Sequence, residues 1–150
     1  MAKRRAEFTQ VTYIAAPPRK VWDALLVPAM TRKYWGVENL SDWKPGSRWE
    51  HRSCGKRAEV IIAGKVLACA APRRLVLSWA SPEEENRKGK VSRVALDLKP
   101  FRGITRLTVT HDELEPGSAM LEGITDGWQK VLSNLKTFLE TGRPLPSLWC

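Results

Sequence analysis

The sequence feature that most constrains the fold is a long amphipathic segment near the C-terminus, over residues 118–141. Ser118 is typical of a helix N-cap, and Gly142 followed by Pro144 is typical of a helix end. Between them the apolar residues recur every three or four positions, which places them within an arc of roughly 120° around the helix. They are Leu121, Ile124, Trp128, Val131, Leu132, Leu135, Phe138 and Leu139. Because the predicted helix has one apolar side, another layer of the protein must cover that side.

The preceding part of the chain is predicted to form that layer from strands. Polar and apolar residues alternate there with a period of two, which is typical of strands that place one face on a core. The predicted strands cover residues 8–15, 47–53, 59–70, 75–79, 93–99 and 106–111. Two short helices are expected after Pro17-Pro18 and from Pro28 to Trp35, and Gly64 predicts a bulge or a bend. We therefore expect an α+β fold: a curved antiparallel sheet of about six or seven strands around a long C-terminal helix, with two short helices after the first strand.

Two glycines lie beside one edge of the apolar stripe of the predicted C-terminal helix. Gly123 and Gly127 are four residues apart, so they lie one above the other on the helix. Each glycine disfavours the helix by about 1 kcal/mol relative to alanine. Such positions indicate that something needs room, either the sheet backbone or a cavity. Because one helix cannot fill a curved sheet completely, we expect a pocket between the two layers.

Aromatic residues, histidines and the two glycines at inward positions are expected to line this pocket. A flat aromatic ligand could stack on an indole there, and packing of the core is the competing interpretation for the tryptophans. The candidate cavity residues are Trp35, Trp49, His51, Trp79, His111, Gly123, Gly127, Trp128 and Val131.

The two histidines, His51 and His111, are the weak candidates for catalytic acid-base groups. His51 shares a strand face with Trp49, so a buried imidazole there needs a partner such as a ligand, a water or Glu59, unless the site is open to solvent near a sheet edge. His111 ends the last predicted strand, either as a core or rim histidine bonded to the backbone or as a polar group at the pocket mouth. The sequence shows no nucleophile elbow, phosphate-binding glycine loop or metal-ligand spacing. An enzyme is therefore disfavoured, and neither a metal nor a cofactor is expected.

The composition of the chain limits which classes of protein and which partners remain possible. A chain of 150 residues with 43% hydrophobic residues is expected to form one domain over residues 1–150, without a membrane span. Its three scattered cysteines favour a reducing, cytoplasmic location. The net charge of +9 suggests acidic small molecules as ligands, but nucleic acid is disfavoured because no nucleic-acid-binding motif is present. Trp149, beyond the last helix, is expected to be exposed or at an oligomer contact.

Six segments resemble a known superfamily in the expected order along the chain. They are residues 16–25 (APPRKVWDAL), 31–36 (TRKYWG), 43–47 (WKPGS), 72–79 (PRRLVLSW), 106–111 (RLTVTH) and 127–128 (GW) with Leu132, Leu135 and Lys136. Together they resemble the SRPBCC (START-like, Bet v 1-like) superfamily, in the bacterial branch homologous to the C-terminal domain of the heat-shock-protein-90 ATPase activator. The resemblance spans about residues 8–144 and implies a helix-grip fold with a hydrophobic cavity.

Three functions follow from the residues and the resemblance together. The leading hypothesis is a module that binds a small hydrophobic or aromatic molecule between the sheet and the C-terminal helix. The second is an enzyme of the polyketide cyclase, aromatase or hydrolase type that uses His51 and His111. The third is a chaperone-linked or homodimeric interaction module. The eukaryotic activator engages the chaperone with the help of a separate N-terminal domain, for which we expect no room in 150 residues.

Overall fold

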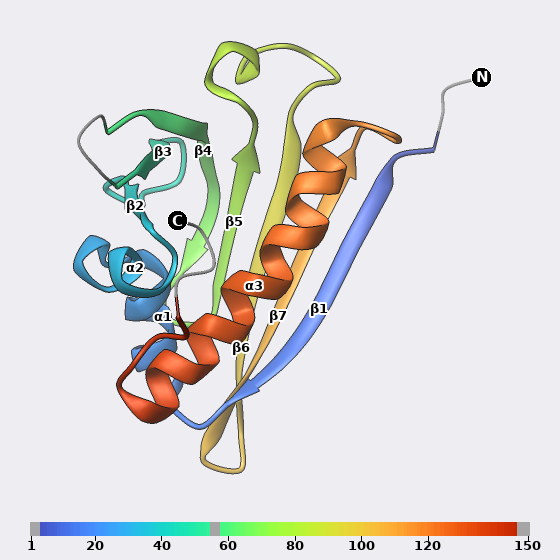
Figure 1. Ribbon diagram of the computed structural model, residues 1–150. Helices are drawn as coiled ribbons and strands as arrows, with labels where there is room; N and C mark the ends of the chain where they lie inside the picture. The colour runs from blue at the N-terminus through green and yellow to red at the C-terminus, as the bar shows by residue number, and fades with distance from the viewer. Residues whose placement is uncertain (1–3, 55–57, 147–150) are drawn as a thin grey trace.

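The computed structural model describes residues 4–54 and 58–146. Within these residues the chain forms a single sheet with helices on one side of it (Figure 1). In chain order the elements are β1 (Ala6–Ile14), α1 (Pro18–Leu26), α2 (Pro28–Tyr34), β2 (Val37–Leu40), β3 (Arg48–Ser53), β4 (Val60–Ala70), β5 (Arg74–Trp79), the 3-10 helix η1 (Pro82–Glu84), β6 (Ser92–Phe101), β7 (Ile104–Leu114) and α3 (Ala119–Thr141). Trp149 lies outside the described residues.

The sheet is antiparallel throughout, with strand order β1-β7-β6-β5-β4-β3-β2. The first strand thus pairs with the last, and β2 forms the opposite edge. Figure 1 shows α3 crossing one face of the sheet, with α1 and α2 beside the β2 end. The predicted α+β class, the long C-terminal helix and the two short helices after the first strand are confirmed. No helix in the described ranges combines the length and apolar character needed to cross a bilayer.

Helix α3 begins and ends where the sequence pattern predicts. The Ser118 hydroxyl accepts a hydrogen bond from the backbone N–H of Leu121 at 3.1 Å, and Gly142 ends the helix with a left-handed φ of 80°. Its buried side chains are Ile124, Trp128, Val131, Leu132, Asn134 and Leu135. At its C-terminal end, Lys136 donates to the carbonyl of Tyr13 at 2.6 Å, which ties the helix to the edge strand β1.

A short strand, β2, joins the six that the alternation pattern predicted. It has four residues, Val37–Leu40, and its two inward positions, Val37 and Asn39, are buried. Four residues that include a glutamate and an asparagine give too short an alternation to stand out in the sequence. The strand matters because it brings Asn39 beside β3, where it contacts a candidate site residue.

The bend predicted at Gly64 allows β4 to pair with two different strands. Its first half pairs with β3 and its second half with β5, and a bridge between Ala63 and Ala80 marks the change. A Cβ atom at Gly64 would overlap the carbonyl group of Ser78. The same carbonyl accepts a hydrogen bond from the indole N–H of Trp49 at 2.8 Å. Glycine is therefore required here by the close approach of two backbones.

Candidate functional site

A cavity of about 100 Å³ lies between β3, β5 and helix α3. Its lining residues are Trp35, His51, Trp79, Gly123, Ile124, Gly127, Trp128 and Val131. Each wall has a different origin in the fold: Trp35 follows the last turn of α2, His51 comes from the middle of β3, and Trp79 ends β5. Helix α3 completes the enclosure with the glycine side of its apolar stripe. The cavity is thus built from segments that are far apart in the sequence.

Aromatic rings form most of the cavity wall and contact one another at tilted or edge-on angles. The ring centroids of Trp35 and Trp128 are 5.5 Å apart, and those of Trp79 and Trp128 are 5.8 Å apart. His51 packs edge-on against Trp35 at 4.9 Å. These geometries are favourable for aromatic pairs. Because the rings do not stack face to face on each other, their faces remain available to line a cavity.

The two helix glycines are not required by packing. A Cβ atom at Gly123 or at Gly127 would meet nothing within 4 Å, and both residues have ordinary helical φ angles. Each nevertheless disfavours the helix by about 1 kcal/mol relative to alanine. The room that the sequence pattern suggested is therefore room at the cavity, and it is not a close contact with the sheet backbone.

His51 is buried and takes its polar partner from β2. Its Nδ1 lies 2.5 Å from Oδ1 of Asn39, whose Nδ2 donates to the carbonyl of Leu25 at 2.9 Å. Glu59, one of the partners considered from the sequence, does not fill this role. Burial lowers the pKa of His51 to about 3, so the imidazole is neutral at pH 7. Asn39 is a site residue that sequence reasoning missed, because β2 was not predicted.

His111 is fully buried behind the cavity wall, since β7 continues three residues beyond it to Leu114. The hydroxyl of Ser92 donates to the carbonyl of Trp79 at 2.9 Å, so its oxygen accepts from Nε2 of His111 at 2.8 Å. Nδ1 of His111 accepts from the indole N–H of Trp128 at 3.1 Å. Both ring nitrogens are thus bonded, and burial lowers the pKa of His111 to about 4. Of the two positions considered from the sequence, His111 takes the one in the core, with side-chain partners in place of the expected backbone bond, and Ser92 was not identified from the sequence.

The indole N–H groups of the tryptophans differ in whether they have a hydrogen-bond partner, as the ring nitrogens of the two histidines do. The indole N–H of Trp49 donates to Ser78, and that of Trp128 donates to His111. The Nε1 atom of Trp79 is buried and has no hydrogen-bond partner within residues 4–54 and 58–146. Trp79 itself is 7% exposed and lines the cavity. A buried indole N–H without a partner is unusual, because such groups normally find one.

Two of the nine candidate cavity residues lie next to the cavity and do not line it. Trp49 borders a neighbouring void of about 10 Å³, and His111 lies behind Trp79 and Trp128. The other seven share the cavity with Ile124, which belongs to the predicted apolar stripe. Helical spacing could have identified Ile124, because it lies three residues before Gly127, at the edge of the apolar stripe that the glycines flank.

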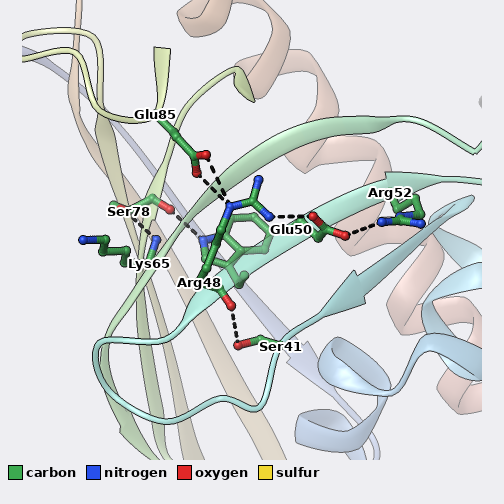
Figure 2. Close-up of polar contacts among 8 residues, drawn as sticks. Ser41, Arg48, Glu50, Arg52, Lys65, Ser78 and Glu85 are labelled. Atoms are coloured by element: carbon green, nitrogen blue, oxygen red, sulfur yellow. Dashed lines mark hydrogen bonds and ion pairs between the residues drawn. The ribbon is translucent and has the colours of Figure 1, made fainter. Parts of the chain in front are cut away.

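Charged residues form a separate network on the outer side of β3. Figure 2 shows Arg48 between Glu85 and Glu50, with Glu50 also bound by Arg52. The hydrogen bond from Arg48 is the main cause that lowers the pKa of Glu50. None of these four side chains lines the cavity. In the described part of the chain, no three His, Cys, Asp or Glu side chains cluster closely enough to hold a metal ion.

A larger cleft of about 390 Å³ lies elsewhere, between η1 and the start of α3. Its residues are mostly polar or charged and include Glu84, Lys90 and Glu113. Their side chains face solvent, and Lys90 is paired with Glu115 at 2.9 Å. The smaller aromatic cavity is therefore the better candidate site, because it is lined mainly by buried apolar side chains together with one polar side chain, His51.

A curved antiparallel sheet that holds a long C-terminal helix over an aromatic cavity defines the helix-grip class of the SRPBCC superfamily. Residues 15–140 match the family described as "Activator of Hsp90 ATPase homolog 1-like protein". Since this match covers most of the chain, the protein belongs to that family. No curated protein sequence matches the chain significantly.

Solved structures share this fold over nearly their whole length. A Cytophaga hutchinsonii protein, ChR145, is 26% identical with a TM-score of 0.73, and the match covers 94% of this chain and 98% of that one. The Aha1 dimer from Colwellia psychrerythraea is 19% identical with a TM-score of 0.73, over 91% and 98% of the two chains. An HSP90 activator from Plasmodium falciparum is 22% identical with a TM-score of 0.70, over 95% and 99%.

Proposed function

We propose that this protein binds a small hydrophobic or aromatic molecule in the cavity between the sheet and α3. The observation that carries the proposal is the pair Gly123 and Gly127. Both weaken the helix, neither is needed for packing or for a special backbone conformation, and both line the cavity. Residues that lower stability without a structural need are typical of positions kept for function.

The size and chemistry of the cavity support a ligand with one aromatic ring at its core. An engineered apolar cavity of roughly 150 Å³ in another protein binds benzene. The cavity here measures about 100 Å³ and borders the exposed residue Gly123, so a ring can enter with its substituents extending to the surface. The faces of Trp35, Trp79 and Trp128 supply the apolar contact area.

An enzymatic role is supported by His51 alone. The two nitrogens of His111 are already hydrogen-bonded within the core, so that residue is poorly placed to move a proton to or from a ligand. The imidazole of His51 is neutral at the cavity wall, although its pKa of about 3 makes it a weak base. Such an activity would predict turnover that is lost in His51→Gln while ligand binding survives.

Two structural relatives, the Aha1 dimer from Colwellia psychrerythraea and the HSP90 activator from Plasmodium falciparum, motivate a separate measurement. Analytical ultracentrifugation reports the oligomeric state of this chain, and a pull-down with the bacterial chaperone reports a complex. A monomer that binds no chaperone and retains ligand binding would support the small-molecule function alone.

Ligand binding is tested by adding lipids, flavonoids and single-ring aromatics while tryptophan fluorescence and thermal unfolding are recorded. The variant Gly127→Leu should fill the cavity and abolish the quenching and the thermal shift. Ser133→Leu is the matched control, because Ser133 is exposed on the same helix and does not line the cavity. Equal binding by both variants would show that any ligand sits elsewhere.

A further inference from the structure

The turn that joins β6 and β7 is a projecting tip at one end of the molecule. Figure 1 shows it extending beyond the rest of the sheet, at the end where β1 stops and α3 finishes. The turn consists of Arg102 and Gly103, whose φ angles of 48° and 83° are typical of a tight two-residue hairpin. This end of the sheet therefore presents a narrow tip to solvent.

Three strands place basic and aromatic residues in one row beside this tip. Tyr13 of β1 lies opposite Arg106 of β7, which in turn lies opposite Lys99 of β6. Side chains alternate between the two faces of a strand, and the neighbouring residues Leu98 and Leu107 are buried in the core. The row therefore lies on the outer face of the sheet, which α3 does not cover.

Two exposed aromatic rings accompany the basic side chains. Tyr13 and Phe101 are each 43% exposed, and their rings pack edge-on with centroids 5.5 Å apart. The guanidinium of Arg102 lies 5.5 Å from the centre of the Phe101 ring. Exposed apolar groups with a polar rim mark surfaces that contact a partner or a membrane. The residues that form this surface, which we call the hairpin patch, are Tyr13, Lys99, Phe101, Arg102 and Arg106.

The carboxylates near the hairpin patch are already paired with other basic residues. Asp97 pairs with Arg74 at 2.5 Å, and Glu140 pairs with Lys136 at 2.8 Å. Within the described residues, several exposed or half-buried basic side chains at this end form no ion pair: Lys20, Arg73, Lys99, Arg102, Arg106 and Arg143. They belong to α1, to the turn before β5, to the hairpin and to the segment after α3. The uncompensated positive charge is therefore spread over a whole end of the molecule.

We propose that the hairpin patch docks on the surface of an anionic phospholipid membrane. The basic side chains are attracted to the lipid phosphates, and the Phe101 ring enters the apolar layer beneath the headgroups. The association is peripheral, with the tip of the hairpin as its point of entry. It goes beyond the proposed small-molecule function and does not depend on it.

A membrane fits this end better than an acidic protein segment does. The cations surround a projecting tip, so they face a broad surface more readily than a single extended chain. A groove of about 270 Å³ does lie on the outer face between β5, β6 and β7, but no residue of the hairpin patch lines it. Its charged side chains are paired with each other, Arg74 with Asp97 and Arg93 with Asp112. The groove therefore offers little free charge to an acidic chain.

The experiment measures cosedimentation of the intact protein with two kinds of vesicle. One contains phosphatidylcholine alone, and the other is an equimolar mixture of phosphatidylcholine and phosphatidylglycerol. We expect binding to the anionic vesicles, little binding to the neutral ones, and weaker binding as the salt concentration rises.

Three variants assign the binding to the hairpin patch. Lys99→Gln should weaken partitioning into the anionic vesicles about fivefold, which corresponds to the attraction of one basic side chain. Phe101→Ser should weaken it about tenfold through the loss of apolar contact. Lys88→Gln is the matched control, because Lys88 is exposed, forms no ion pair in the described part of the chain and precedes β6 at the opposite end of that strand. It should change partitioning by about twofold or less.

A spectroscopic measurement locates the contact without any substitution. When bicelles that contain phosphatidylglycerol are added, the amide signals of residues 99–106 should broaden, whereas those of residues 82–88 should not.

Several outcomes would overturn the proposal. Equal binding to neutral and anionic vesicles, or no binding to either, excludes an anionic membrane as the partner. Equal weakening by Lys88→Gln and Lys99→Gln, or unchanged binding in Phe101→Ser, excludes the hairpin patch as the contact. Tighter binding of polyglutamate or of a DNA oligonucleotide than of the vesicles, weakened by Lys99→Gln, would assign the patch to an acidic macromolecule instead.

Discussion

The surroundings of His111 and His51 show two opposite uses of a buried histidine within one aromatic cluster. His111 has partners for both nitrogens, in a chain that runs from Trp128 through His111 and Ser92 to the carbonyl of Trp79. His51 has a partner for one nitrogen, Asn39, and its ring borders the cavity. The first arrangement fixes the wall, because every polar atom in it is satisfied. The second leaves one ring nitrogen of His51 without a partner among the described residues.

The largest expected effect comes from removing the satisfied histidine. His111→Ala leaves the indole N–H of Trp128 without its acceptor and opens a void in the core, so we expect a loss of at least about 3 kcal/mol in the free energy of unfolding. His51→Ala should lose about half as much, because its ring supports one bond and borders an existing cavity. Urea unfolding of both variants measures the difference. A larger loss for His51→Ala would contradict the distinction between the two sites.

Acid should destabilise the protein through both histidines. Their folded pKa values, about 3 for His51 and about 4 for His111, lie below the ordinary value of 6.5. The unfolded chain therefore binds protons that the folded chain does not, and stability falls as the pH decreases below 6.5. Between pH 7.5 and pH 5 we expect a loss of about 2 kcal/mol for each histidine.

The variant His51→Phe isolates one of these contributions. Urea unfolding at pH 7.5 and pH 5 should show that the acid-dependent loss shrinks by about 2 kcal/mol in the variant. The range ends at pH 5 because carboxylates with lowered pKa, such as Glu50, contribute mainly in more acidic solution. An unchanged pH dependence would mean that His51 is not buried in its neutral form.

A smaller effect of opposite sign is expected at the cavity glycines. Gly127→Ala should raise the free energy of unfolding by about 1 kcal/mol, because alanine favours the helix and its methyl group meets nothing within 4 Å. Gly142→Ala is the matched control on the same helix, and it should lower stability by about 1 kcal/mol because φ there is 80°. Thermal unfolding reports both changes, and ligand titration should show weaker binding in Gly127→Ala. A destabilised Gly127→Ala would show that the glycine has a structural role.

The smallest effect is expected outside the aromatic cluster. Arg48→Gln removes exposed ion pairs with Glu50 and Glu85, and exposed pairs contribute little to stability. We expect a change within about 0.5 kcal/mol and no change in ligand affinity, measured by thermal unfolding and titration. A marked loss of affinity would indicate that the charged surface takes part in binding.

The parts of the fold that were predictable are those with a clear local period. The apolar stripe of α3, its Ser118 and Gly142 ends, and the long alternating strands all appear in the structure as predicted. The strand β2 did not stand out, because four residues carry too few repeats of any period. The site residues also divide into those with a local pattern and those without one. The alternation of polar and apolar residues predicts inward positions such as Trp79, whereas no pattern predicts the roles of Asn39 and Ser92.

The sequence by itself determined which residues face inward, where the long helix begins and ends, and which helix positions lack a side chain. These properties depend on neighbours within a few residues along the chain. The tertiary structure alone decided which polar atoms are paired, because the bonds of His51 to Asn39 and of His111 to Trp128 and Ser92 join residues on different elements. Whether a buried histidine closes the core or meets a ligand depends on those contacts, and no local pattern encodes them.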